Sequence, residues 1–502
     1  MGSSPSNPTN DSRDVLDTIK QMSKYYVATT IPYVNDKPHL GHAMLHIYAD
    51  VLARYHRQLG DQVLLSCGTD EHGGKIAESA AKAKLDPKAF TDKLSQTFID
   101  FNKTLDISCD RFIRTSDPAH EKRAQLIWTS LNKYIYKGSY EGWYCTGDEE
   151  FFSEKVVKAN NGVCPDHNRP YEKVKEENYL FALSKFTAQI KEAIEKDIYR
   201  VVPDRSKNEI LSLLNSGLED ISISRPVSKI NWGIPVPGDD KQVMYVWFEA
   251  LMNYITVLGY PDQPDFKTYW PADAQIIGKN ILRFHAAIWP GMLLGLGLPL
   301  PKLLYAHGFI EVDGKKMSKS LGNVVDPMDV VKKFGTDATR YYLMRHMPSY
   351  GDGDFSWERM ESAYNDELAN QLGNGVSRTA AMIKRYLGGV IGVLPESDHD
   401  IAEYQQALDD CRFDKALDEV WEQVKGVNQY IDETKPWEIA KENDPEHTRE
   451  VLASAAASLI QVADLLLPFM PSTAAQIKEV FGTGVVKELP GSLFPKSEKK
   501  PA

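Results

Sequence analysis

Residues 24–42, KYYVATTIPYVNDKPHLGH, give the clearest indication of the fold. Residues 24–31 are β-branched and aromatic, so they predict a buried strand. Residues 32–38 contain Asn, Asp and two prolines, which are typical of a turn. A helical pattern then runs from His39 to Leu59, because apolar residues recur at intervals of three and four.

A second strand is predicted at residues 62–67, QVLLSC, directly after this helix. A strand, a crossover helix and another strand in this order predict parallel strands. The strand pattern returns in VMYVWFEAL, residues 243–251, and in AQIIGKN, residues 274–280. We therefore expect an α/β fold with a Rossmann-like parallel sheet that is split by an insertion.

The rest of the chain changes character twice. Residues 138–235 hold turns, short strands and two cysteines, and predict an inserted domain, whereas the pattern after about residue 355 is helical and predicts a bundle. The expected parts are a disordered tail at 1–23, the two halves of the sheet domain at 24–137 and 236–325, the insertion at 138–235, a connecting region at 326–360, the helical domain at 361–490 and a tail at 491–502.

The composition narrows the class of protein. The chain has 502 residues, of which 42% are hydrophobic, and no apolar run is long enough to span a membrane. Five cysteines form no dense framework, so we expect a reducing, cytoplasmic location. The net charge of −12 means that a nucleic acid would have to bind local basic patches.

The first motif with chemical content is PHLGH, residues 38–42, at the predicted strand-to-helix junction. Free N–H groups and the helix dipole attract phosphate at such a position, and Gly41 leaves room for a nucleotide. His39 and His42 can both donate hydrogen bonds to phosphate oxygens. A bare H-x-x-H is also common by chance, and alone it favours a pair of surface histidines beside a helix cap.

The second motif is KMSKS, residues 316–320, in the glycine-flanked loop VDGKKMSKSLGN at 312–323. Lys316 and Lys319 could close on a triphosphate and neutralise the leaving pyrophosphate. An exposed lysine loop without function is also common. The two motifs in this order around one sheet are far more specific than either motif alone.

Together the motifs resemble the HIGH and KMSKS signatures of class I aminoacyl-tRNA synthetases, with HLGH at the first. The surrounding segments are similar to the methionyl-tRNA synthetase family from about residue 24 to 490. This resemblance implies a catalytic domain split by a connective domain, a stem-contact region at 326–360 and an anticodon-binding bundle at 361–490. It also implies that ATP, with Mg²⁺, activates L-methionine as methionyl-adenylate, which is then transferred to the 3′ end of tRNA(Met), including initiator tRNA.

The resemblance also implies roles for individual residues, since such catalysis depends mostly on positioning and charge stabilisation. His39, His42, Lys316 and Lys319 would be catalytic, and the expected ATP contacts are His39, Gly41, His42, Gly278, Lys279, His307 and Lys319. A thioether is best recognised by apolar and aromatic surface. The expected methionine contacts are Ile31, Tyr33, Asp70, Trp247, Ala250, Leu251, Tyr254, Ile281 and His285.

Several of these assignments have a structural alternative. Asp70 would bind the substrate ammonium group, but it also precedes a helical pattern and could cap that helix. The aromatic residues of the pocket could instead be ordinary core residues. Leu251 stands where a proline is frequent in the family, so the pocket wall is expected to differ slightly.

The insertion contains a possible metal site. Cys145, Asp148, Cys164 and His167 have the two-pair spacing of a zinc knuckle. Family members often carry three or four cysteines there, whereas Asp148 replaces a thiolate in this chain. A structural zinc ion and a metal-free loop stabilised by packing are equally consistent with this pattern.

The helical domain holds the residues that would read RNA. Asn370, Asn374 and Arg378 are spaced four apart on a predicted helix, and Trp437 could stack on an anticodon base. The alternative is a solvated helix face and a tryptophan that packs against Pro436. Arg225 and Arg340 are further candidates for tRNA or phosphate contacts, and the absence of an evident extra C-terminal domain favours a monomer.

Three other functions agree less well with the sequence. A class I ligase for leucine or valine would carry a much larger editing insertion. A non-catalytic tRNA-binding or assembly protein derived from a ligase would not need both intact motifs. A small nucleotidyltransferase would not need the helical domain.

Overall fold

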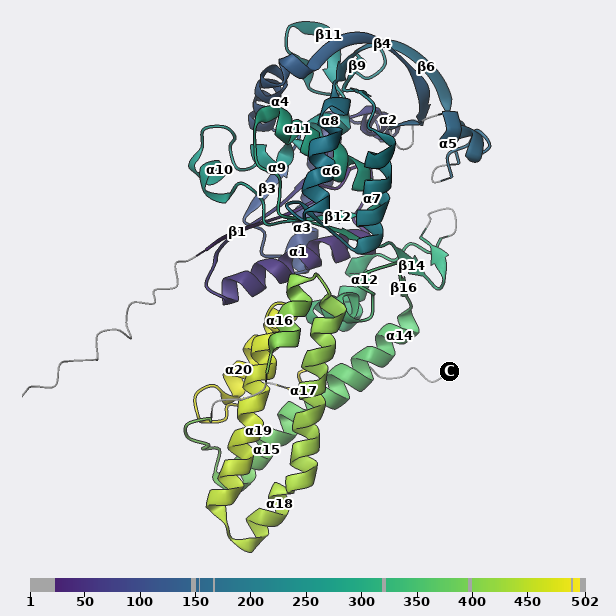
Figure 1. Ribbon diagram of the computed structural model, residues 1–502. Coiled ribbons are helices and arrows are strands. Elements are labelled where there is room, and N and C mark those ends of the chain that lie inside the picture. The colour runs from purple at the N-terminus through teal and green to yellow at the C-terminus, as the bar shows by residue number, and fades with distance from the viewer. Residues whose placement is uncertain are drawn as a thin grey trace, which may run out of the picture.

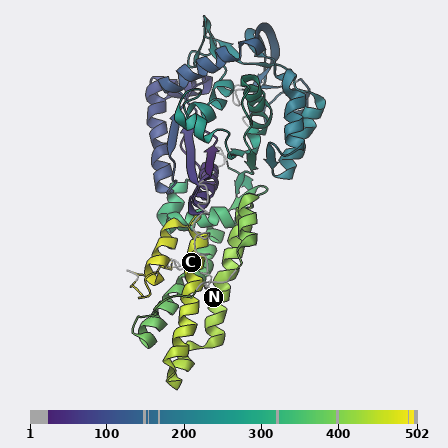
Figure 2. The same ribbon diagram turned by 60° about the vertical axis from the view of Figure 1, so that its left-hand side comes forward.

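The computed structural model describes residues 23–145, 150–152, 154–165, 168–317, 322–395, 400–488 and 491–496. Within this part, an α/β body carries an elongated helical bundle, and Figures 1 and 2 show the bundle extending away from the body. Most of the predicted N-terminal tail lies outside the described residues. Among the described helices, none is long and apolar enough to cross a membrane.

A six-stranded parallel sheet forms the centre of the body, in the order β3-β2-β1-β12-β13-β7. Helix α1 (Leu40–Gln58) crosses from β1 to β2, which confirms the predicted crossover. Strands β2 and β3 lie on one side of β1, and strands β12, β13 and β7 lie on the other side. The strand order therefore reverses beside β1. The strands are β1 (Lys24–Thr29), β2 (Gln62–Thr69), β3 (Arg111–Arg114), β7 (Arg200–Val202), β12 (Ala274–Gly278) and β13 (Leu303–His307).

Both faces of this sheet are buried, as expected for parallel strands. Side chains alternate along β1, so that Val27 packs into one core with α1, while Tyr26 and Ala28 pack into a second core on the other face. The helices around the sheet are α2 (Gly74–Lys82), α3 (Pro87–Thr104), α4 (Pro118–Ser130), α6 (Thr187–Glu195), α7 (Asp204–Ser216), α8 (Val246–Leu251), α9 (Asn253–Thr256), α10 (Pro264–Tyr269) and α11 (Trp289–Leu296).

The inserted region forms two small antiparallel sheets, which stand at the top of Figure 1. Their strands are β4 (Ile135–Cys145), β5 (Glu150–Phe152), β6 (Glu172–Phe181) and β8 (Ile221–Ser222) in one sheet, and β9 (Ser224–Pro226), β10 (Pro235–Val236) and β11 (Asp239–Met244) in the other; α5 (Glu154–Ala159) lies between β5 and β6. The domain boundaries stay a prediction. Strand β7 falls within 138–235 yet joins the parallel sheet, and its three residues are too few to show a periodicity.

The chain then forms a hairpin and the bundle. Strands β14 (Ile310–Val312) and β15 (Lys315–Lys316) pair across a turn in which Asp313 and Gly314 have φ of 51° and 70°, while β16 (Gly353–Phe355) pairs with β14. The helices are α12 (Pro327–Phe334), α13 (Thr336–Arg345), α14 (Trp357–Ser362), a π-helical segment (Ala363–Gly373), α15 (Asn374–Leu387), α16 (Ala402–Asp409), α17 (Phe413–Thr434), α18 (Pro436–Ile439), α19 (Pro445–Leu466) and α20 (Pro471–Phe481).

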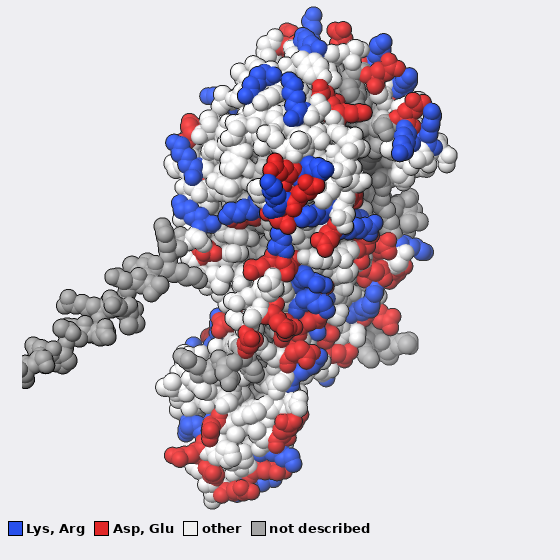
Figure 3. Space-filling view, viewed as in Figure 1, with Lys and Arg blue, Asp and Glu red and all other residues white. Residues whose placement is uncertain are grey.

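Charge is mixed over the surface. Figure 3 shows Lys and Arg interspersed with Asp and Glu on the viewed face. This face therefore presents no single broad basic field, in agreement with the net charge of −12.

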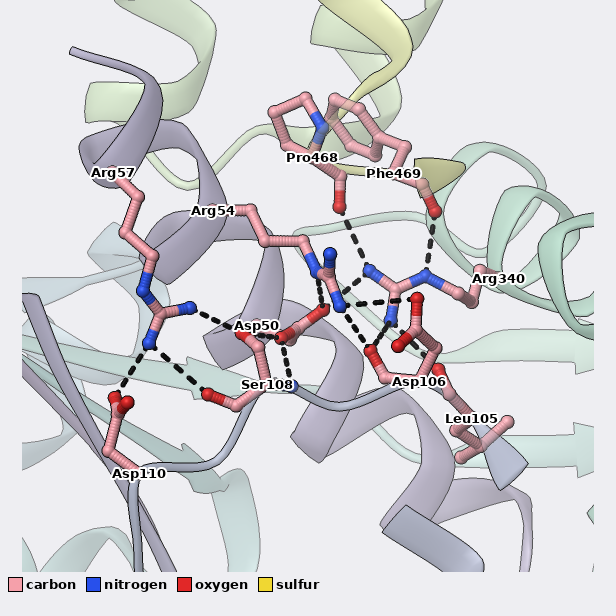
Figure 4. Close-up of polar contacts among 10 residues, drawn as sticks. All are labelled: Asp50, Arg54, Arg57, Leu105, Asp106, Ser108, Asp110, Arg340, Pro468 and Phe469. Atoms are coloured by element: carbon pink, nitrogen blue, oxygen red, sulfur yellow. Dashed lines mark hydrogen bonds and ion pairs between the residues drawn. The ribbon is translucent and has the colours of Figure 1, made fainter. Parts of the chain in front are cut away.

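Arg340 on α13 joins the bundle to the α/β body (Figure 4). Its guanidinium donates to Asp50 Oδ2 of α1 at 2.7 Å, to the carbonyl of Leu105 at 3.0 Å, and to the carbonyls of Pro468 and Phe469 at 2.9 and 2.7 Å. The side chains of Arg340 and Asp50 are both fully buried. Arg340 is therefore a structural residue, which argues against the predicted contact with a tRNA phosphate.

Candidate active site

The predicted site residues converge on one edge of the parallel sheet. Carboxyl ends of parallel strands meet at the same edge, and ligands bind there beside the point where the strand order reverses. In this structure that point is β1, flanked by β2 and β12. The edge collects Ile31 and Tyr33 after β1, Asp70 after β2, Gly278 and Lys279 at the end of β12, His307 at the end of β13, and His39, Gly41 and His42 at the start of α1.

His39 and His42 form a reciprocal cap at the start of α1. The Gly41 N–H donates to Nδ1 of His39 at 3.1 Å, and the His39 N–H donates to Nδ1 of His42 at 3.2 Å. The two rings stack with centroids 3.8 Å apart. Because each Nδ1 accepts a hydrogen bond, the proton of each neutral ring lies on Nε2, where it can be donated to a ligand.

Both imidazoles are neutral donors at pH 7. Burial lowers the pKa of His39 to about 4. Burial, followed by the charges of His39, His46 and His307, lowers the pKa of His42 well below its usual value. A Cβ on Gly41 would lie 3.0 Å from the His39 ring, a tight contact to which the ring would have to yield.

His307 presents an unpaired buried nitrogen at the same edge. Its Nδ1 lies 2.7 Å from the Gly308 carbonyl, so Nδ1 donates and Nε2 is an acceptor, and burial lowers the pKa of His307 to about 4. Within the described structure Nε2 has no hydrogen-bond partner. A Cβ on Gly278 would lie 4.0 Å from this ring, so both residues border the same space. A buried polar atom without a partner is costly, and a ligand hydroxyl or amino group would satisfy it.

The structure describes the segment around Lys279 in full and the loop of Lys316 and Lys319 only in part. Lys279 Nζ pairs with the carboxylate of Asp352 at 2.6 and 2.7 Å and lies 4.6 Å from the Phe309 ring centroid. Lys316 pairs through its backbone with Glu311 in the hairpin. Lys319 lies outside the described residues, so its contact with a nucleotide stays a prediction.

The predicted methionine pocket is assembled around His285. Tyr254 Oη donates to His285 Nε2 at 2.8 Å, because His285 Nδ1 is directed to the Ile281 carbonyl at 3.0 Å. Burial lowers the pKa of His285 to about 4, so this imidazole is neutral. It lies in a π-helical turn, Phe284–Ile288, a feature that is frequent at functional sites.

Helix α8 carries three further residues of the predicted methionine pocket. The Trp247 ring stacks on Phe284 with centroids 4.1 Å apart, and Trp247 is half-buried. Ala250 and Leu251 are buried on the same helix. Tyr254 and Phe284 belong to one hydrophobic core, against which the half-buried Trp247 and Ile281 pack, so the methionine contacts stay a prediction.

Asp70 is fixed by its backbone beside the end of β1. Its N–H donates to the Pro32 carbonyl at 2.8 Å, and its carbonyl accepts from the Val34 N–H at 3.0 Å. The side chain is buried, with Thr115 Oγ1 at 3.5 Å from Oδ1. Helix α2 begins at Gly74 with Gly73 as its N-cap, so Asp70 does not cap it and that alternative is wrong.

Three buried polar residues near the loop of Asp70 have no role predicted from the sequence. His72, His120 and Glu249 are 2%, 2% and 0% exposed, and both histidines contact Glu249. Glu249 stands in the quoted segment VMYVWFEAL, and His72 follows the predicted site residue Asp70 by two positions. A single acidic residue within an otherwise apolar segment was the available signal.

The possible metal site is described only in part. Cys145 and Cys164 are buried in one small cluster with Val157 and Tyr171. Asp148 and His167 lie outside the described residues. Across the described ranges, no group of three or more His, Cys, Asp or Glu residues is placed to hold a metal ion.

The predicted RNA-reading residues lie on the bundle. Asn370 and Asn374 are exposed, and the Arg378 guanidinium lies 5.3 Å from the ring centroid of the half-buried Trp437. Arg378 is also paired with Asp432 at 2.5 Å. In contrast, Arg225 is 4% exposed and pairs with Glu176 at 2.9 Å, which argues against the predicted tRNA contact.

Comparisons with known proteins agree with this arrangement. Residues 25–173 and 167–380 match the family model "tRNA synthetases class I (M)", and residues 393–492 match "Anticodon binding domain of methionyl tRNA ligase". A methionine–tRNA ligase of Caldanaerobacter subterraneus is 44% identical over 91% of this chain and 74% of its own length, and that of Streptomyces coelicolor is 42% identical over 93% and 91%. The Mycobacterium tuberculosis methionyl-tRNA synthetase in complex with methionyl-adenylate superposes with a TM-score of 0.89 at 35% identity, covering 94% of this chain and all of that one.

Proposed function

This chain belongs to the methionyl-tRNA synthetase family of class I tRNA ligases and is a methionine–tRNA ligase, and on that premise we propose how its residues share the reaction. The relatives support the catalytic interpretation and not the non-catalytic alternative. The observation that carries the residue assignments is the convergence of His39, His42, Asp70 and His307 on one edge of the sheet.

In the activation step, the methionine carboxylate attacks the α-phosphate of ATP and pyrophosphate leaves. The Nε2–H groups of His39 and His42 donate to phosphate oxygens as charge develops there. Lys316 and Lys319 hold the departing pyrophosphate from their loop. Mg²⁺ would accompany ATP and would neutralise charge on its phosphates.

Methionine lies between an anion and an aromatic wall. Asp70 binds the ammonium group, while Trp247, Tyr254 and His285 surround the thioether. The neutral His285, fixed by Tyr254 and Ile281, keeps this end of the pocket uncharged, which suits a soft and nearly uncharged sulfur.

In the transfer step, a hydroxyl at the 3′ end of tRNA(Met), including initiator tRNA, attacks the adenylate carbonyl. In the bundle, Asn370, Asn374 and Arg378 hydrogen-bond to the edges of the anticodon bases, and Trp437 stacks on the face of a base. The contact between Arg378 and Trp437 supports a shared surface. Monomeric state and cytoplasmic location stay predictions, which gel filtration and cell fractionation test.

The insertion offers a separate, structural proposal. Buried thiols are suitable zinc ligands, and Cys145 and Cys164 would hold a structural Zn²⁺ together with Asp148 and His167. Elemental analysis decides between this site and a metal-free loop. One zinc per chain that is lost in Cys164→Ser supports the site, and zinc-free protein excludes it.

Amino-acid-dependent ATP–pyrophosphate exchange tests the assignments. We expect exchange with methionine and little with leucine or valine. His42→Ala and Lys319→Ala should each lower the rate at least ~10-fold while the circular dichroism spectrum is unchanged, because each removes a group that contacts phosphate. Normal exchange in both variants would mean that these residues do not contact the phosphates.

A further inference from the structure

A buried cluster of two imidazoles and a carboxylate includes His72, which follows Asp70 by two residues. Glu249 on α8 accepts a hydrogen bond from Nδ1 of His72 at 2.9 Å and from Nε2 of His120 at 3.0 Å. The other ring nitrogen of His120 lies 2.8 Å from Thr256 Oγ1. The cluster therefore ties together four elements: the loop after β2 and helices α4, α8 and α9.

The surroundings of His72 are strongly anionic. Glu249 faces it from α8, the Glu121 carboxylate lies 3.7 Å from its Nε2 on α4, and Asp70 acts on it from its own loop. The Trp232 ring, 5.3 Å away between centroids, carries no charge. Burial alone would lower the pKa of His72, but the charge and hydrogen bond of Glu249, with the nearby carboxylates of Glu121 and Asp70, raise it to about 10.

His72 thus differs from the other histidines of the site. Burial keeps His39, His285 and His307 neutral at pH 7, whereas His72 carries a proton. A buried carboxylate such as that of Asp70 is costly unless positive charge lies nearby. The imidazolium of His72 supplies that charge two residues along the chain.

We propose that His72 is a positioning residue for the substrate amino group: it balances the charge of the Asp70 carboxylate and, through its hydrogen bond to Glu249, fixes the Asp70 loop relative to helix α8. The same helix carries Trp247, Ala250 and Leu251, so one buried cluster sets the distance between the ammonium site and the side-chain pocket. This inference rests on the proposed role of Asp70. Glu249 and His120 do not contact the substrate and act through His72.

The test uses the pH dependence of methionine binding, which a purely structural role would not change. In the wild-type enzyme, the KM for methionine in ATP–pyrophosphate exchange should be constant between about pH 6 and pH 8, because His72 stays protonated. Glu249→Gln removes the main charge partner, so the pKa of His72 should fall toward its ordinary value of about 6.5. The KM for methionine should then rise ~10-fold from pH 6 to pH 8 as His72 loses its proton, while the KM for ATP stays constant.

Two variants complete the design. His72→Gln should raise the KM for methionine at every pH without a new slope, since glutamine never carries the charge. Glu121→Gln is the matched control, because Glu121 is partly exposed and lies 3.7 Å away, so its effect should be smaller than that of Glu249→Gln. An unchanged KM in His72→Gln, or a Glu249→Gln KM that is the same at pH 6 and pH 8, overturns the proposal.

Two further measurements keep the outcome decisive. NMR titration of ¹³C-labelled histidine in the wild-type enzyme should show His72 protonated at pH 8, and a neutral His72 at pH 7 overturns the proposal even if Glu249→Gln does not fold. Asp70→Asn separates this inference from the assignment beneath it. If Asp70→Asn leaves the KM for methionine unchanged, the ammonium site is misplaced; if it raises that KM and His72→Gln does not, only the role of His72 fails.

Discussion

Replacing Arg340 by methionine should cost about 4 kcal/mol of unfolding free energy, because it breaks a buried ion pair that joins the bundle to α1. Removal of one partner of a buried pair costs about 3–5 kcal/mol, since the other charge is left without compensation. Here Asp50 keeps Arg54 at 2.7 Å and the Ser108 N–H at 2.7 Å, which lowers the loss. The variant also removes the hydrogen-bond donor of the carbonyls of Leu105, Pro468 and Phe469, which raises the loss of unfolding free energy.

Urea titration followed by circular dichroism measures this change, with Lys196→Met as the control. Lys196 and Glu192 are 2.6 Å apart but 62% exposed each, so that variant should lose far less stability than Arg340→Met. The double variant Asp50→Leu/Arg340→Met should recover part of the loss, because no buried charge is left alone. An Arg340→Met variant as stable as Lys196→Met would refute the reasoning.

Three further predictions follow from the site and the bundle. Tyr254→Phe removes the donor to His285, so kcat/KM for methionine should fall ~5–10-fold with the KM for ATP unchanged, and an unaltered kcat/KM would remove Tyr254 from the pocket. Burial lowers the pKa of His39 and His307 from 6.5 to about 4, so the unfolded chain binds more protons and the free energy of unfolding should fall as pH is lowered from 6.5 to 4; urea titrations at pH 7 and pH 5 with equal midpoints would contradict this. Trp437→Ala should lower kcat/KM for tRNA ~10-fold or more and leave pyrophosphate exchange intact, since a base–aromatic stack contributes about 1–3 kcal/mol; a loss of exchange would indicate a folding defect instead.

The sequence predicted those parts of the fold that depend on local pattern. The strand at 24–31, the turn and the helix from His39 are confirmed by β1 and α1, because burial on both sides of a parallel strand leaves a continuous apolar run. Strand β7 has three residues and could not be recognised. Its place in the sheet depends on pairing with β13, which no local pattern encodes.

The same limit applies to the site. Asp70 could be chosen from its place after a strand, but its alternative role as a helix cap was excluded only when α2 was seen to begin at Gly74. The partnership of His72 with Glu249 spans 177 residues of sequence, and their pairing depends on tertiary packing. For Arg340 the sequence led to a wrong prediction. An arginine in the connecting region was expected to contact RNA at the surface, whereas its side chain is fully buried.

The central claim is that Asp70 holds the substrate amine while His39 and His42 hold its phosphate at the same edge of the sheet. A crystal structure of this enzyme with the sulfamoyl analogue of methionyl-adenylate measures both contacts at once. We expect the amine nitrogen about 2.7–2.9 Å from an Asp70 carboxylate oxygen, with the thioether against Tyr254 and the sulfamoyl group beside the imidazoles. An amine bound away from Asp70, or a sulfamoyl group away from the start of α1, would contradict the account.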